Sequence, residues 1–172
     1  MGQWGTTEVA GLDAIDPTHV SSTRNGAVLT VLFDDFVLSL QTPADPLDAL
    51  RAVHLRAPFA LSKGAGLEAF VVDVRGSAEL AEGCSSSPIC IAGSAVHTLA
   101  LSDACQASRG ECTTSLVTLV RRPSEDERPE GAPPLPPLPP LSISLALAVQ
   151  RQGTESKLLA SVDSIDVRAL AG

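Results

Sequence analysis

One segment near the C-terminus alternates apolar and small polar residues more strictly than any other part of the chain. Apolar side chains occupy every second position from Leu141 to Val149, and the positions between them hold only Ser or Ala. Because successive side chains of a β-strand point to opposite faces of a sheet, this period predicts a strand with one buried face. Such a strand is typical of an antiparallel sheet that packs one side on a core.

Weaker versions of this pattern recur along the chain, with turn signals between them. Asp34 and Asp35 interrupt the first of them, which indicates either two strands or one strand with a bulge. The bulge is favoured because Asp-Asp is a poor hairpin turn. Strands are expected within residues 28–40, 53–59, 70–75, 96–101, 116–120, 141–149 and 159–167, and one helical turn over residues 47–50. The sequence therefore predicts an all-β fold, an antiparallel β-sandwich with about seven or eight strands and long loops.

The chain of 172 residues fits one domain. Residues 1–24 show no period and are expected to be irregular, whereas residues 25–172 are expected to form a single β-sandwich domain. Within it, residues 121–140 combine a charged run with a proline tract, which predicts a solvated loop insertion that ends as polyproline II. Aromatic residues make up only 3% of the chain, so the core must be mainly aliphatic.

The four cysteines, Cys84, Cys90, Cys105 and Cys112, lie in one stretch of the chain. An even, clustered set predicts two disulfides, for which three pairings exist. We favour the local pairs Cys84–Cys90 and Cys105–Cys112, because each closes a short loop rich in turn residues. Structural zinc is the alternative, but its ligands usually come in pairs separated by only two to four residues.

Disulfides indicate an extracytoplasmic protein, secreted or periplasmic. No signal peptide is visible, so we expect an export signal upstream of Met1.

The charge balance limits the partners that the chain can bind. It has 20 acidic residues against 12 Lys and Arg, for a net charge of −8. An acidic surface repels phosphate backbones, so nucleic acid is not an expected partner. No apolar run reaches the length of a membrane span. The expected partner is an extracellular protein or surface.

No set of residues carries a recognisable catalytic motif. The three histidines stand alone, and no nucleophile elbow or ordered Ser/His/Asp set is present. Calcium binds six to eight oxygens, and the candidates to supply them are Asp34, Asp35, Asp163 and Asp166. Solvated turns and strand caps are the favoured interpretation of these aspartates, so we predict no metal and no cofactor.

The best-supported function is a secreted or cell-surface, non-enzymatic β-sandwich with a binding or structural role. Its disulfide loops and Pro-rich loop would present the contact surface. One alternative is a protease-inhibitor-like module that uses the Cys84–Cys90 loop, and another is a hydrolase whose groups meet only in space. PxxP spacings in the proline tract fit an aromatic groove, although a stiff spacer is the favoured interpretation.

Four short motifs resemble those of a known family. They are residues 32–36 (Leu-Phe-Asp-Asp-Phe), 54–58 (His-Leu-Arg-Ala-Pro), 73–76 (Asp-Val-Arg-Gly, continued to Gly83) and 162–166 (Val-Asp-Ser-Ile-Asp). The chain resembles a family of secreted bacterial and fungal proteins catalogued as domain of unknown function four-three-six-zero. The resemblance spans roughly residues 24–168 and implies a secreted β-rich domain. It implies no activity, because the function of that family is unknown. The early cysteines of the family are missing here.

Overall fold

A computed structural model describes residues 2–13, 20–80, 85–86, 89–92, 95–98, 111–151 and 153–172. Regular structure within these residues consists only of β-strands, and the strands pair antiparallel. The predicted all-β, antiparallel fold is confirmed. Among the described residues there is no helix that could cross a membrane.

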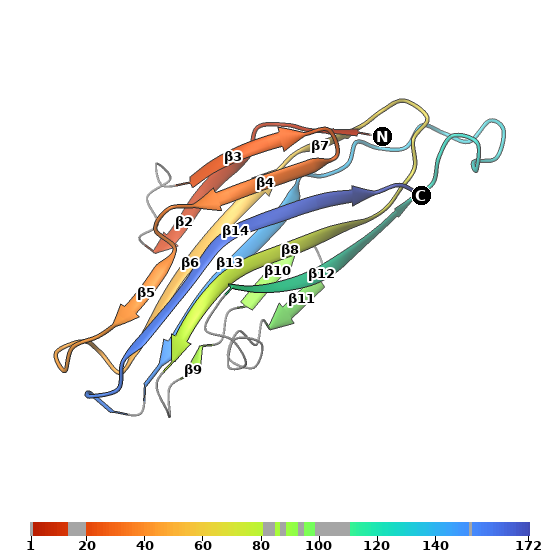
Figure 1. The fold of residues 1–172 in the computed structure, drawn as a ribbon. Coiled ribbons are helices and arrows are strands. Elements are labelled where there is room, and N and C mark those ends of the chain that lie inside the picture. The colour runs from red at the N-terminus through yellow and green to blue at the C-terminus, as the bar shows by residue number, and fades with distance from the viewer. Residues whose placement is uncertain are drawn as a thin grey trace.

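The first of two six-stranded sheets is built around β13 (Figure 1). Its strands are β2 (Glu8–Asp13), β6 (Asp48–Ala57), β9 (Ser85–Ser86), β10 (Ile89–Ala92), β11 (Ala95–Thr98) and β13 (Leu141–Gln150). They follow the order β11-β10-β13-β6-β2, and β9 also pairs with β13. We call this the β13 sheet.

The second six-stranded sheet is built around β14 and is called the β14 sheet. Its strands are β3 (Val20–Asn25), β4 (Val28–Phe33), β5 (Val37–Leu40), β8 (Leu67–Leu80), β12 (Glu111–Arg122) and β14 (Leu158–Leu170). They follow the order β12-β8-β14-β4-β3, and β5 also pairs with β14. A separate two-stranded ribbon joins β1 (Gly2–Trp4) to β7 (Phe59–Leu61).

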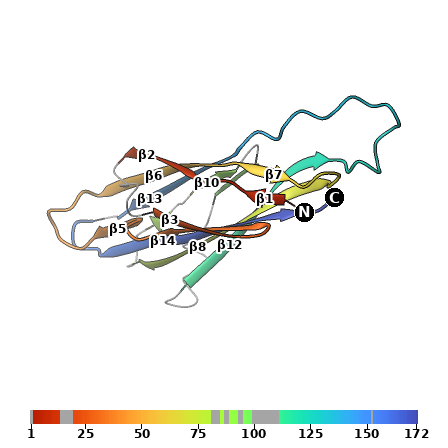
Figure 2. The same cartoon turned by 90° about the horizontal axis from the view of Figure 1, so that it is seen from above.

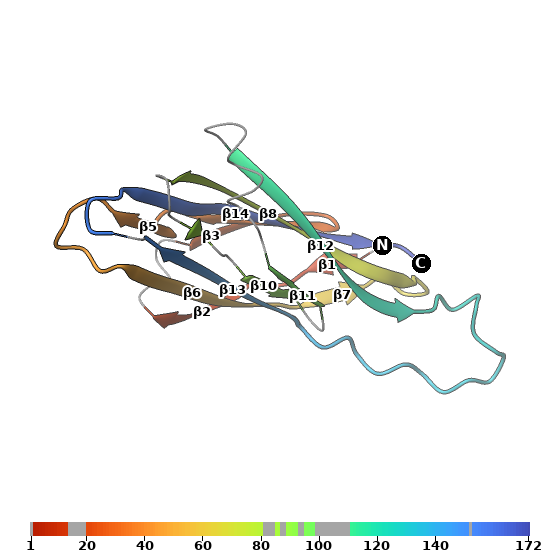
Figure 3. The ribbon, with the colours of Figure 1, turned by 90° about the horizontal axis from the view of Figure 1, so that it is seen from below.

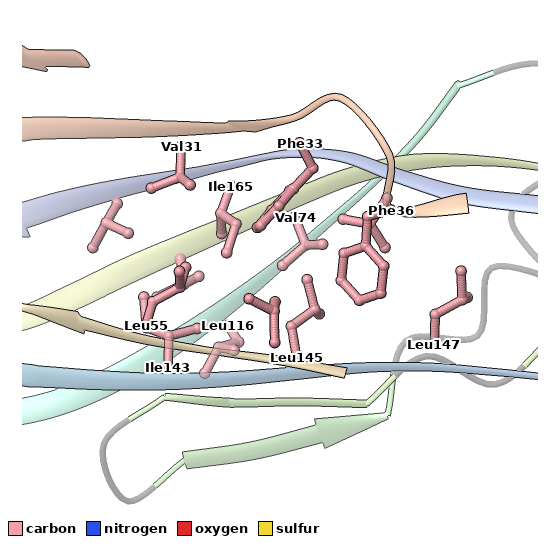
Figure 4. Close-up of a cluster of buried hydrophobic side chains, with 14 of the residues drawn as sticks. Val31, Phe33, Phe36, Leu55, Val74, Leu116, Ile143, Leu145, Leu147 and Ile165 are labelled. Atoms are coloured by element: carbon pink, nitrogen blue, oxygen red, sulfur yellow. The ribbon is translucent and has the colours of Figure 1, made fainter. Parts of the chain in front are cut away.

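The two sheets form two layers (Figures 2 and 3). Val31 and Ile165 from the β14 sheet point toward Leu55 and Ile143 from the β13 sheet (Figure 4). All four are at most 1% exposed, and they belong to one hydrophobic cluster. Both sheets therefore bury their apolar faces in the same core.

The period-two segments form the expected strands. In β13 the apolar positions from Leu141 to Val149 are buried and the small residues between them are partly exposed. In β6 the same alternation buries Val53, Leu55 and Ala57. These strands can be predicted locally because each has one face on the core.

The sequence predicted that residues 1–24 are irregular, but the part of this segment that the structure describes, residues 2–13 and 20–24, is mainly strand. They contain β1, β2 and most of β3. β1 pairs with β7 and β2 pairs with β6, both far along the chain. Backbone hydrogen bonds to distant strands stabilise β1 and β2. The alternation of apolar and polar residues within a segment does not reveal such distant pairing.

Residues 47–50 do not form a helical turn. β6 begins at Asp48, which lies opposite Gln150, so the ladder with β13 runs over the full length of both strands. The ladder pairs the backbone groups of residues 48–50 that face β13, which a single helical turn would leave without a partner.

The interruption at Asp34 and Asp35 lies within one line of pairing. β4 and β5 are separate strands, but both pair with β14, one after the other. Between them the carbonyl of Phe36 accepts a 2.9 Å hydrogen bond from the N–H of Val162. The structure thus has two strands, which was one of the two alternatives, and the favoured single bulged strand is wrong.

All the aromatic side chains are buried. Trp4 is 5% exposed, and its Nε1–H donates to the carbonyl of Ala27 at 2.9 Å. Its ring centroid lies 4.7 Å from that of Phe59 and 5.2 Å from that of Phe70. The core is mainly aliphatic, but this aromatic cluster fills the end of it next to β7.

Candidate functional site

The most prominent surface feature is the segment that links β12 to β13. Residues 123–140 contain no strand and extend beyond the sheets before they return to β13 (Figures 2 and 3). We call them the Pro-rich loop. The sequence placed its start at residue 121, but Arg121 and Arg122 belong to β12.

Two arginines hold the proline half of this loop. Arg122 donates from Nη1 to the carbonyl of Pro136 at 2.5 Å and from Nη2 to that of Leu135 at 3.4 Å. Arg128 donates to the carbonyl of Pro133. A polyproline II segment has no internal hydrogen bonds, so these guanidinium groups supply the contacts that fix its position.

The charged half of the loop is ordered by a turn and by one contact with the body. The N–H of Ser124 donates to a carboxylate oxygen of Glu127 at 2.8 Å, and its hydroxyl donates to the same oxygen at 3.0 Å. The N–H contact, followed by the hydroxyl, lowers the pKa of Glu127 below its ordinary value. The N–H of Glu125 donates to the carbonyl of Gly64 at 3.1 Å, which ties the loop to the turn before β8.

Leucines recur at every third position where the loop enters β13. Leu135, Leu138 and Leu141 are separated by pairs of prolines. Because polyproline II has three residues per turn, the conformation expected from the sequence puts the three leucines on one face. Leu141 is 5% exposed, Leu138 packs partly buried against the core, and Leu135 is 38% exposed. This spacing is visible in the sequence, but only the packing against the core shows which way the leucine face turns.

Three cavities lie along the same loop. The first, of about 250 Å³, is lined by uncharged residues and by the charged side chains of Lys63, Arg122, Glu125 and Arg128. The second, of about 410 Å³, is mainly apolar: Gly5, Pro58, Phe59, Ala60, Leu61, Arg122, Pro137 and Leu138. The third, of about 310 Å³, lies where the loop enters β13 and is lined by Phe70, residues 118–120 and residues 138–142. This end of the molecule, with the Pro-rich loop and its cavities, is the candidate functional site.

One histidine contacts serines, but not in a catalytic arrangement. His54 Nδ1 lies 2.9 Å from Ser144 Oγ, and Nε2 lies 3.4 Å from Ser142 Oγ. A general base needs a group that orients it, and no carboxylate among the described residues contacts His54. None of the three cavities includes His54.

Two of the calcium candidates are held by arginines. Asp35 pairs with Arg51 at 3.3 Å, and Asp166 pairs with Arg75 at 2.7 Å. A guanidinium that neutralises a carboxylate competes directly with a cation for its oxygens.

The other two calcium candidates are exposed. Asp34 lies between β4 and β5, and Asp163 accepts a 2.8 Å hydrogen bond from Ser161 at the irregularity in β14. Within the described residues the four aspartates do not form a group of three that could hold a metal ion.

The cysteine predictions lie largely outside the described residues. Cys84 and Cys105 are not described, so neither disulfide can be placed. The backbone puts Cys90 in β10, opposite His97, and Cys112 in β12, opposite Gly76.

Two comparisons of the sequence with known proteins give no match. No protein-family model matches the chain, and no curated protein is similar to it in sequence. The function must therefore be argued from the site itself.

Proposed function

We propose that this chain is an extracytoplasmic, non-enzymatic β-sandwich that binds a protein partner through the candidate functional site. One observation carries the proposal. A long loop that extends beyond both sheets is held in place by Arg122 and Arg128, and three cavities adjoin it.

Binding surfaces are often loops that a rigid scaffold presents. A loop whose backbone carbonyls are already bonded to side chains of the same protein loses less conformational entropy on binding than a free loop. The fixed position of the Pro-rich loop favours a recognition role over that of a flexible linker.

The disulfides Cys84–Cys90 and Cys105–Cys112 belong to the same proposal. In the chain-entropy model a short closed loop contributes about 2–3 kcal/mol by restricting the unfolded chain. Intact mass after alkylation, with and without prior reduction, tests them. We expect no alkylated cysteine before reduction and four after it. Four reactive thiols in the native protein would contradict both the disulfides and the extracytoplasmic location.

The binding role is tested by replacing residues 124–139 with a Gly-Ser linker of equal length. Native and replaced chains are compared against a panel of purified extracellular proteins by biolayer interferometry. We expect at least one partner whose affinity falls at least tenfold on replacement. Circular dichroism and urea unfolding serve as controls that the replaced chain still folds. A panel without any partner, or partners that bind both chains equally, would contradict the proposal.

A further inference from the structure

We infer that residues 133–140 form a proline ridge that docks into a partner groove lined by aromatic side chains. The inference rests on the proposed function, because it names the chemistry of the partner that binds this site. Three observations support it: the orientation of the tract, its backbone chemistry and its ordering before binding.

The period-three pattern orients the ridge. With three residues per turn, the leucine face of the tract turns toward the core at Leu138 and Leu141, and the two proline faces lie on either side of it. The face with Pro134 and Pro137 borders cavities. Pro133 and Pro136 share the other proline face, are exposed, and line none of the three cavities. A partner can reach both rings without moving the loop.

The backbone of the ridge excludes pairing as a β-strand. Six of its eight residues are proline and lack an N–H. The carbonyls of Pro133, Leu135 and Pro136 already accept hydrogen bonds from the protein's own arginines. A partner therefore contacts mainly ring surface, and flat aromatic side chains match that surface.

The ridge is ordered before binding. Polyproline II is intrinsically stiff, and Arg122 and Arg128 hold its carbonyls. Recognition of proline tracts by aromatic grooves depends on this low entropic cost. The exposed rings of a fixed ridge, and not its leucines, then determine affinity.

The test uses the full chain with three isolated probe domains that have aromatic grooves: an SH3 domain, a WW domain and an EVH1 domain. Each ¹⁵N-labelled domain is titrated with the full chain and followed by NMR. We expect shifts of the aromatic groove resonances in at least one domain. The double variant Pro133→Ala/Pro136→Ala should bind that domain at least tenfold more weakly, with unchanged circular dichroism, because both rings are exposed.

The matched control is Pro43→Ala/Pro46→Ala. These two prolines have the same spacing and are also exposed, but they lie in the loop between β5 and β6, at the opposite end of the molecule (Figure 1). The control should bind as the native chain does. Absence of binding to all three domains, or equal binding by the Pro133/Pro136 variant, would overturn the inference.

The two proposals fail in different ways. A protein partner whose binding is lost on replacement of residues 124–139, but is unchanged by Pro133→Ala/Pro136→Ala, would support the proposed function and contradict the proline-ridge inference. A partner that binds the replaced chain and the double variant as tightly as the native chain would contradict the proposed function and the proline-ridge inference.

Discussion

At the scale of single residues, Arg151 combines burial with complete hydrogen bonding. It is 2% exposed, and each of its five guanidinium N–H donors has a carbonyl acceptor. The acceptors are Pro46 at 3.1 Å, Thr154 at 2.9 Å, Ser156 at 3.2 Å, Thr42 at 2.9 Å and Asp45. One side chain thus joins the turn before β6 to the turn before β14.

Replacing Arg151 with lysine should destabilise the fold by about 3 kcal/mol. An ammonium has three donors, so at least two buried carbonyls lose their partners, each at a cost of about 1–3 kcal/mol. Urea unfolding should show a lower midpoint with an unchanged m value. The control is Arg24→Lys, since Arg24 is exposed. Equal midpoints for the two variants would show that the carbonyls find other donors.

Arg121 has a backbone conformation that favours glycine. Its φ is 53°, at the irregularity where β12 loses register with β8. The left-handed region costs an L-residue about 1–2 kcal/mol. Its ion pair with Glu68, at 4.0 Å between exposed side chains, contributes little.

Arg121→Gly should therefore stabilise the protein by about 1 kcal/mol, because glycine adopts positive φ without steric cost. Thermal unfolding should show a higher Tm. Arg121→Ala separates the two causes, since alanine removes the charge and keeps the Cβ. A gain of the same size with alanine would mean that charge, and not backbone strain, is responsible.

At the scale of elements, β8 continues past Gly76 to Leu80, although the strand expected from the sequence ended at residue 75. The missing side chain of Gly76 allows the close approach, because a Cβ there would lie 2.2 Å from the carbonyl oxygen of Ser161 in β14. Gly76→Ala should cost about 2–3 kcal/mol, as overpacking forces the two strands apart. The control is Gly153→Ala, where a Cβ meets nothing within 4 Å. Similar stabilities of the two variants in urea would contradict the close contact.

Two turns are capped by carboxylates, which makes their stability depend on pH. The N–H groups of Thr42 and Gln41 lower the pKa of Asp45 below its ordinary value of 3.8, and Ser124 lowers the pKa of Glu127 below 4.5. A lowered folded pKa stabilises the fold above the unfolded pKa, and this contribution is lost as pH falls through the folded value. Stability in urea should therefore fall below about pH 4.

The pH effect can be assigned with Asp45→Asn and Glu127→Gln. Each variant should be less stable at neutral pH and should lose less stability on acidification than the native chain, because the amide does not titrate. Direct NMR titration of the two carboxyl groups gives the second measurement. Ordinary pKa values in the folded protein would mean that the caps do not form in solution.

The sequence predicts strands correctly where apolar and polar residues alternate along a segment that has one face on the core. The alternation around Ile143 is set by one sheet face and is visible without the fold. Trp4 and Arg151 contact residues that are distant in the sequence, and many of these contacts are to backbone carbonyl oxygens. Every residue has such an oxygen, so no sequence pattern predicts these partners. The Pro-rich loop lies between these cases. Its composition was recognised, and the spacing of Leu135 and Leu138 contained its orientation, but only the packed core decides which face turns inward.

At the scale of the whole molecule, both sheets contribute to one hydrophobic cluster, so we predict a single cooperative unit. Trp4, packed on Phe59 at the end with the Pro-rich loop, reports on tertiary structure there. Arg151 lies at the other end of β13, roughly 30 Å away for a strand of this length. Urea unfolding followed by Trp4 fluorescence and by far-UV circular dichroism should give coincident transitions. Arg151→Lys should lower both midpoints equally, because a cooperative core transmits a loss at one end to the other. A Trp4 transition that stays in place while the dichroism shifts would contradict the single unit and divide the chain into separately stable parts.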